Sequence, residues 1–377
     1  MKVRLGNYIK EYSVRNKKDE DIPVYSVTNT QGFCQDYFGK EVASKDKTTY
    51  KIVPRGCFAF NPSRINVGSV DWQKNEERVI VSPLYNVFSV SEQLDQQYLY
   101  YYLKSDFAIQ KIRAVATGSV RDNLKLAMLY EFPIEIPVIA EQRKIVDRLD
   151  RVKWLIELRE KELQSLDELI KARFVEMFGD PEAGKCRYGT KKLGELSVKI
   201  SDGVHAKPNY TETGRPFLSV VNINKGIVDF TDCKYVSEEA YKKMIKSTHP
   251  ENGDVLYTKV GATYGIPAYV DTDKEFCLYV SVCLIKPKHE RINARFLSIQ
   301  MGMPSIKHQA DARIKGIGVP DLHLNQIREF NIICPPRALQ DEFVAFVDQV
   351  DKSKAQVQKA LNETQLLFDS LMQKYFG

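Results

Sequence analysis

The chain is 377 residues long, is 43% hydrophobic and carries a net charge of +6 at pH 7. At about 150 residues per domain, this length predicts two or three domains with cores of their own, and the mild positive charge permits a polyanionic partner without requiring one. No apolar stretch of signal-peptide or membrane-spanning type occurs and the seven cysteines are scattered, so we expect a cytoplasmic protein with no leader, no membrane span and reduced thiols.

The first part of the chain, residues 1–137, has the pattern of a β-rich domain. Runs rich in β-branched and aromatic residues at 24–29, 57–65 and 78–90 predict short strands separated by turns. The segment 94–116, which is aromatic on one face, predicts one helix after these strands.

A long helix is predicted at residues 138–180. Its apolar residues are spaced alternately three and four apart from Ile145 to Met177, with Arg159 and Arg173 as interruptions. This 3.5-residue period is typical of a coiled-coil seam, and a helix of this length spans on the order of 55 Å.

The same succession of elements follows in the second part of the chain. Strands are predicted within 217–224, 254–270 and 276–287, one helix at 293–312, and a second long helix at 336–377. The seam of this helix runs from Phe343 to Tyr375 and is interrupted at Lys354 and Thr364.

The two parts are copies of one unit. Gly377 lies 198 residues after Gly179, and the same offset places Gln340 on Gln142 without a gap between. We therefore predict an α+β fold with two repeated β-rich domains, residues 1–137 and 188–335, separated by two long helices. Tandem copies related by a pseudo-two-fold axis would pair these helices as an antiparallel coiled coil.

Polar, glycine-containing loops recur at equivalent places in the two copies. Residues 60–68 correspond to 257–265, and residues 116–124 correspond to 312–322. Glycine lets a backbone approach a phosphate, and Arg, Lys, Asn, Ser and Thr bind phosphates or base edges. An ordinary surface turn is the alternative for any single loop. The candidate DNA-binding residues are Ser63, Arg64, Asn66, Thr117, Ser119, Arg121 and Asn123 in the first copy, and His205, Lys207, Thr258, Lys259, Thr263, Tyr264, Arg313 and Lys315 in the second.

No catalytic residues and no metal ligands are identified in the sequence. The "NPSR" at Asn61 lacks the second proline and the aromatic residue of the adenine methyltransferase signature. There is no phosphate-binding loop of the Walker type, and the five histidines have no metal-ligand spacing.

The arrangement resembles the specificity subunit of a Type I restriction–modification enzyme. The resemblance is carried by "IEIPVIAEQRKIVDRLD" from Ile134 and its repeat "IICPPRALQDEFVAFVD" from Ile332, in which a proline precedes a glutamine at the start of a long helix. The segments "KLGELSVKISDG", "RPFLSVVNINKG" and "ATGSVRDNL" add to it. The resemblance covers the whole chain, although the second copy has "RALQ" where "IAEQ" is usual.

The resemblance implies a non-catalytic subunit with two target recognition domains, each of which reads one half of a split target in double-stranded DNA. The coiled coil would set the gap between the two halves. Two methyltransferase subunits would bind the helices and motor–nuclease subunits would join them, so S-adenosylmethionine, ATP and Mg are expected only on those partners. The alternative is a non-catalytic coiled-coil scaffold with two protein-binding modules.

Overall fold

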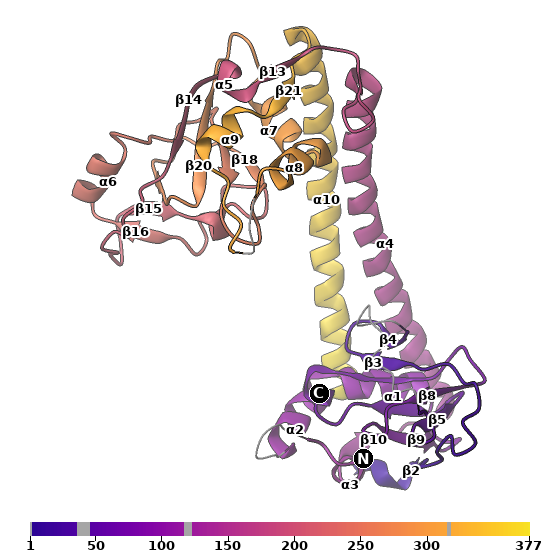
Figure 1. Cartoon of the computed structure of the whole chain (residues 1–377). Helices are drawn as coiled ribbons and strands as arrows, with labels where there is room; N and C mark the ends of the chain where they lie inside the picture. Colours follow the sequence, from indigo (N-terminus) through magenta and orange to yellow (C-terminus); the bar gives the residue numbers. More distant parts are fainter. Residues whose placement is uncertain (1, 36–45, 117–122, 315–317) are drawn as a thin grey trace. The chain divides into compact units, whose positions relative to one another are not determined.

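The structure is a computed structural model that describes residues 2–35, 46–116, 123–314 and 318–377. It contains two compact units, and Figure 1 labels many of their helices and strands. Unit 1 comprises Met1–Lys161 together with Val357–Gly377, and unit 2 comprises Glu162–Gln356. Each unit therefore holds one β-rich module and parts of both long helices.

Unit 1 is built on a four-stranded antiparallel sheet with the order β2-β9-β6-β7, beside which lie the pairs β1-β10, β3-β4 and β5-β8. The strands are β1 (Lys2–Arg4), β2 (Ile9–Glu11), β3 (Ser26–Thr28), β4 (Gly32–Cys34), β5 (Lys51–Pro54), β6 (Phe58–Phe60), β7 (Val70–Trp72), β8 (Arg78–Val81), β9 (Asn86–Val90) and β10 (Pro133–Glu135).

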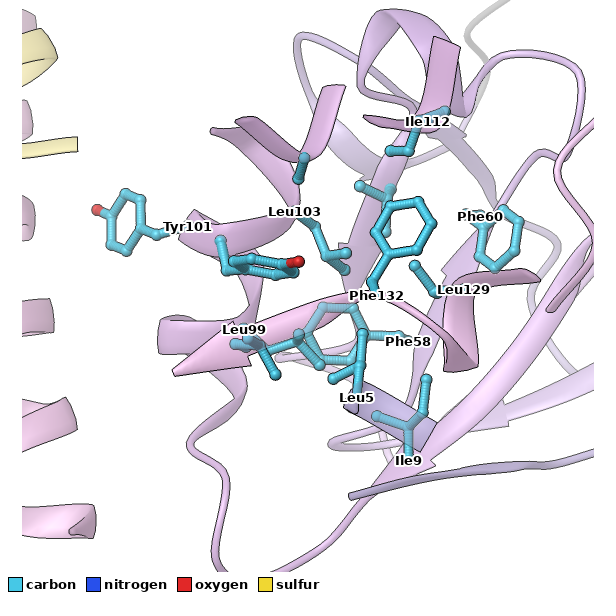
Figure 2. Packing of buried hydrophobic residues seen from close by; sticks show 14 of the residues in the cluster. Leu5, Ile9, Phe58, Phe60, Leu99, Tyr101, Leu103, Ile112, Leu129 and Phe132 are labelled. Atoms are coloured by element: carbon cyan, nitrogen blue, oxygen red, sulfur yellow. The ribbon is translucent and has the colours of Figure 1, made fainter. Parts of the chain in front are cut away.

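The core of unit 1 lies between this sheet and the helices that follow it. Phe58 and Phe88 stack across neighbouring strands with their ring centroids 5.1 Å apart. Leu103 and Phe132 are fully buried in the same cluster, and Figure 2 shows these side chains converging with Phe58. Large aromatic rings bury much apolar area, so the burial of this cluster stabilises the unit.

Unit 2 repeats this topology. Its four-stranded sheet has the order β14-β20-β17-β18, which matches the unit 1 order strand for strand, and the pair β13-β21 matches β1-β10. The strands are β11 (Gly179–Asp180), β12 (Lys185–Cys186), β13 (Thr190–Lys192), β14 (Ser197–Asp202), β15 (Arg215–Leu218), β16 (Lys234–Val236), β17 (Val255–Thr258), β18 (Pro267–Tyr269), β19 (Cys277–Leu278), β20 (Val282–Pro287) and β21 (Asn331–Ile333). The repeat predicted from the sequence is confirmed by this shared strand order.

The single late helix predicted in each module is wrong, because each is two helices. In unit 1 the Ser105 backbone is extended, its hydroxyl donates to the Tyr102 carbonyl, and it accepts from the Ala108 amide, so it ends one helix and caps the next. In unit 2 the interruption falls at Gly302–Met303 before Pro304, which starts the second helix. The shorter helices are α1 (Gln96–Lys104), α2 (Asp106–Val115), α3 (Leu126–Tyr130), α5 (Leu193–Leu196), α6 (Glu238–Met244), α7 (Ala294–Met301), α8 (Pro304–Asp311) and α9 (Leu324–Arg328).

The two long helices, α4 (Ile139–Phe178) and α10 (Arg337–Phe376), begin and end within two residues of their predicted bounds. Within unit 1 they pair antiparallel, since Arg148 bonds Tyr375 and Arg159 bonds the Ala360 carbonyl. Within unit 2 the same direction is seen, where Asp167 accepts from Lys354 and Arg173 donates to Glu342. The predicted polar interruptions at Arg159 and Lys354 are therefore positions where one long helix hydrogen-bonds to the other.

A buried glutamine fixes the start of each long helix. Gln142 accepts from the Asp95 amide at 2.9 Å and donates to the carbonyls of Gln93 and Pro137 at 2.8 and 2.7 Å. Gln340 makes the equivalent bonds in unit 2, to the Asn293 amide and the Arg291 and Pro335 carbonyls. Both glutamines are fully buried. In both copies, the glutamine of this bracket therefore bonds the backbone carbonyl of the residue five positions before it.

The last turn of each long helix completes the core of the module from the other copy. Phe376 packs on Tyr98 in unit 1 with ring centroids 5.1 Å apart, and Phe178 packs on Phe296 in unit 2 at 5.2 Å. All seven cysteines are free, as predicted. Among the helices of the described residues, none is long and apolar enough to cross a membrane.

Candidate nucleic-acid interface

The described parts of the two candidate loops in each copy lie together. In unit 1 the segment after β6 meets the segment before α3, because the Leu124 amide donates to the Pro62 carbonyl at 3.1 Å. In unit 2 the segment after β17 meets the segment before α9 through the equivalent bond, from the Leu322 amide to the Lys259 carbonyl at 2.9 Å. The two units thus share the same junction, a backbone hydrogen bond between these two segments, but the side chains around it differ.

In unit 1 this junction borders a groove of about 750 Å³. Ser63, Arg64 and Asn123 line the groove beside the residues of β3, and Arg64 and Asn123 are exposed. Ser63 is oriented by Asn61, whose Oδ1 accepts both the amide and the hydroxyl of Ser63. The hydroxyl, amide and guanidinium groups of this groove can hydrogen-bond to base edges, and tyrosine and aliphatic side chains form the rest of its lining.

The loop that carries Arg64 is held by two side chains that sequence reasoning missed. Lys104 donates to the Gly68 carbonyl at 2.5 Å, and Arg113 donates to the Asn66 carbonyl at 3.1 Å. Gly68 has a φ of +87°, a conformation that favours glycine, so the turn can close only with such a residue there. Asn66 is half-buried beside this turn. Thr117, Ser119 and Arg121 of the prediction lie outside the described residues, as does Lys315.

Thr258, one of the candidate DNA-binding residues, lies inside the module. It is fully buried at the end of β17, and its hydroxyl donates to the Thr263 carbonyl and accepts from the Ile266 amide. Thr258 therefore closes the turn that presents Thr263, which is exposed. Tyr264 is half-buried and donates its hydroxyl hydrogen to Asp311, while the Lys307 ammonium lies over its ring.

Lys259, another candidate DNA-binding residue, is also buried, and only 4% of it is exposed. Its ammonium lies 3.4 Å from Asp321 Oδ1 and 3.7 Å from Asp202 Oδ2. Burial raises the pKa of the Asp202 carboxyl above its usual value, and the nearby Lys259 opposes that rise. Lys259 thus joins three loops from inside the module.

Arg313 likewise makes its contacts within the module. Its guanidinium donates to the carbonyls of Gln309 and Glu329 at 2.6 and 3.2 Å and lies over the Phe330 ring. His205 and Lys207 are exposed, as a surface contact requires. His205 lies 3.8 Å from Asp202, so it borders the loops that Lys259 joins.

Asp321 is a residue that sequence reasoning missed. It lies 198 positions after Asn123, directly before the leucine that makes the junction, and its side chain is 44% exposed. The repeat offset could have identified it, since it pairs Asp321 with a predicted site residue. Among the described residues, no group of three His, Cys, Asp or Glu side chains could hold a metal ion.

The chain matches one family model in both of its copies. Residues 2–168 and 188–364 match the Type I restriction modification DNA specificity domain. The chain is 22% identical over 412 aligned residues to the EcoKI specificity subunit of Escherichia coli K12, covering 99% of this chain and 86% of that protein. It is 23% identical over 348 residues to the MjaIX specificity subunit of Methanocaldococcus jannaschii, covering 86% and 77%.

Two solved structures have the same fold. One comes from work on complex assembly and conformational transition of a Type I restriction–modification system, with a TM-score of 0.61, 19% identity, and coverage of 100% of this chain and 97% of that one. The other is the Type I restriction–modification S subunit from M. genitalium, with a TM-score of 0.53, 17% identity, and coverage of 100% and 96%. The α+β fold of two repeated β-rich domains with two long helices, predicted from the sequence, is therefore shown.

Proposed function

Because the chain belongs to the Type I restriction modification DNA specificity family, we propose that its two modules each read one half of a bipartite sequence in double-stranded DNA. Two methyltransferase subunits dock on the chain and methylate adenine at the sequence it selects. Motor–nuclease subunits join the assembly for cleavage. S-adenosylmethionine, ATP and Mg supply their chemistry on those partners.

The observation that carries this proposal is one loop junction built twice with different side chains. A duplicated scaffold gives each module the same approach to a duplex, because B-DNA itself offers equivalent grooves at successive turns. Different side chains at equivalent positions then select different bases, since the major groove presents a distinct donor and acceptor pattern for each base pair. A bipartite target with unlike halves follows from this arrangement.

The second candidate is a scaffold that holds two protein partners. Its support is the pair of long helices, which would serve an adaptor equally well. The guanidinium, hydroxyl and amide groups at the unit 1 groove favour DNA, because they can hydrogen-bond to phosphates and base edges. Arg64 and Asn123 lie at the border of that groove.

A salt titration of duplex binding separates these two functions. DNA binding by the full chain, assembled with its partner subunits, should weaken steeply as salt rises, since each phosphate contact contributes a slope of about −0.9 in a plot of log affinity against log salt. Mapping methylated adenine in the host genome with and without the gene should then reveal one bipartite sequence that depends on it. A flat salt response together with an unchanged methylation map would reject the proposal.

A further inference from the structure

Asn123 and Asp321 occupy the same position in the two modules but differ in hydrogen-bonding chemistry. We propose that both are base-reading residues, and that Asp321, positioned by Lys259, accepts a hydrogen bond from the amino group of a cytosine in the second half-site. This inference rests on the proposed function and names one contact within it.

The equivalence is set by the backbone. Each residue directly precedes the leucine whose amide bonds the segment after the central strand, at 3.1 Å for Leu124 and 2.9 Å for Leu322. A short helix begins two residues after each leucine, α3 in unit 1 and α9 in unit 2. The two side chains therefore leave equivalent points on equivalent scaffolds, and both residues are exposed.

The chemistry of the two side chains differs in one respect. An asparagine amide both donates and accepts, which matches the N7 acceptor and N6 donor of adenine. An ionised aspartate only accepts. Cytosine offers the N4 amino group in the major groove, whereas the N7 of adenine would repel the second carboxylate oxygen. The pair therefore assigns adenine to Asn123 and cytosine to Asp321.

A buried lysine accompanies the acidic residue. The ammonium of Lys259 lies 3.4 Å from Asp321 Oδ1 and 3.7 Å from Asp202 Oδ2. The equivalent of Lys259 in unit 1 is Pro62, which has no charge, just as Asn123 has none. The charged lysine after the central strand and the charged aspartate that is proposed to read a base therefore occur in the same module, unit 2.

The charges at this corner disfavour a role in phosphate binding. One lysine faces two carboxylates, so the corner is net negative and repels the DNA backbone. A residue that touches DNA here must meet a hydrogen-bond donor, and base amino groups supply one. Lys259 holds Oδ1 of the Asp321 carboxylate and leaves Oδ2 for the base, which makes Lys259 a positioning residue.

The substitution Asp321→Asn tests the assignment, because it changes the hydrogen-bonding pattern and keeps the size of an exposed side chain. In the full chain with its partner subunits, methylated adenine is mapped across the host genome for the native protein, for Asp321→Asn, and for Asp271→Asn as a control on another exposed aspartate. We expect one cytosine of the second half-site to be replaced by adenine, with a preference change on the order of ten- to hundredfold. The first half-site and the gap should stay the same, and the control should match the native map.

An unchanged second half-site with Asp321→Asn would overturn the assignment, and so would an equal loss at both halves. Either result leaves the proposed function standing, since the native gene still specifies a methylated sequence. The variant Lys259→Met removes the ammonium from the corner. It should relax the same single position, and a native map from this variant in folded form would show that Lys259 does not position Asp321.

Discussion

Replacing Gln142 with methionine tests whether the buried bracket holds unit 1 together. The substitution keeps the length of the side chain and removes its three hydrogen bonds, which measure 2.9, 2.8 and 2.7 Å to the Asp95 amide and the Gln93 and Pro137 carbonyls. Each such bond contributes about 0.5–1.5 kcal/mol net, so the loss should be about 2–4 kcal/mol, with more if the backbone groups stay unpaired.

Hydrogen exchange followed by mass spectrometry measures this loss unit by unit, which matters because a chain with two units need not unfold in one step. Amides of α1 and β10 should exchange faster in Gln142→Met, while those of unit 2 keep their native rates. Gln340→Met should give the mirror result in unit 2. The exposed Gln164→Met on the same helix should change stability by less than about 0.5 kcal/mol. A loss below about 1 kcal/mol for Gln142→Met, or equal loss in both units, would refute this account of the bracket.

Further predictions concern the helices and the first loop. Deleting one heptad from each long helix, Arg159–Ser165 and Val357–Glu363, keeps both seams in phase and shortens each helix by about 10 Å. Mapped methylation should show that the gap between the half-sites contracts by about three base pairs, or that specific methylation is lost. An unchanged gap would contradict the proposal that the helices set the distance between the half-sites. Phe376→Ala should destabilise unit 1 by about 3–5 kcal/mol, and Phe178→Ala should destabilise unit 2. Hydrogen exchange measures both effects, and faster exchange in unit 2 for Phe376→Ala or in unit 1 for Phe178→Ala would contradict this prediction. Arg64→Ala should weaken selection at the first half-site by about 1–3 kcal/mol in competition binding with variant duplexes, and equal weakening for every duplex would make it a phosphate contact.

The architecture could be predicted because the sequence patterns that indicate it extend over long stretches of the chain. A constant offset and a 3.5-residue period each extend over dozens of residues, so single exceptions such as Arg159 do not hide them. The division of the late helix was readable as well. Ser105 before Asp106 is a capping signal, and Pro304 disfavours helical backbone at the residue before it.

The candidate site could be predicted only in part, because composition does not give side-chain direction. Strand β17 is buried along its whole length, so no alternation of polar and apolar residues marks Thr258 as inward-facing. The burial of Lys259 depends on Asp202 and Asp321, which are distant from it in sequence. Such a pairing appears only once the loops are brought together.

The division of the chain between the two units has a consequence for its synthesis. Unit 2 is one continuous stretch, whereas unit 1 needs Val357–Gly377, which a ribosome makes only after the 195 residues of unit 2. At about 5–20 residues per second, this interval lasts roughly 10–40 s. Throughout it, the rings of Tyr98 and Tyr102 lack the Phe376 side chain that covers them in the folded protein. The module that emerges first is therefore finished last, and its aromatic surface is open to chaperones while the rest of the protein is still being translated.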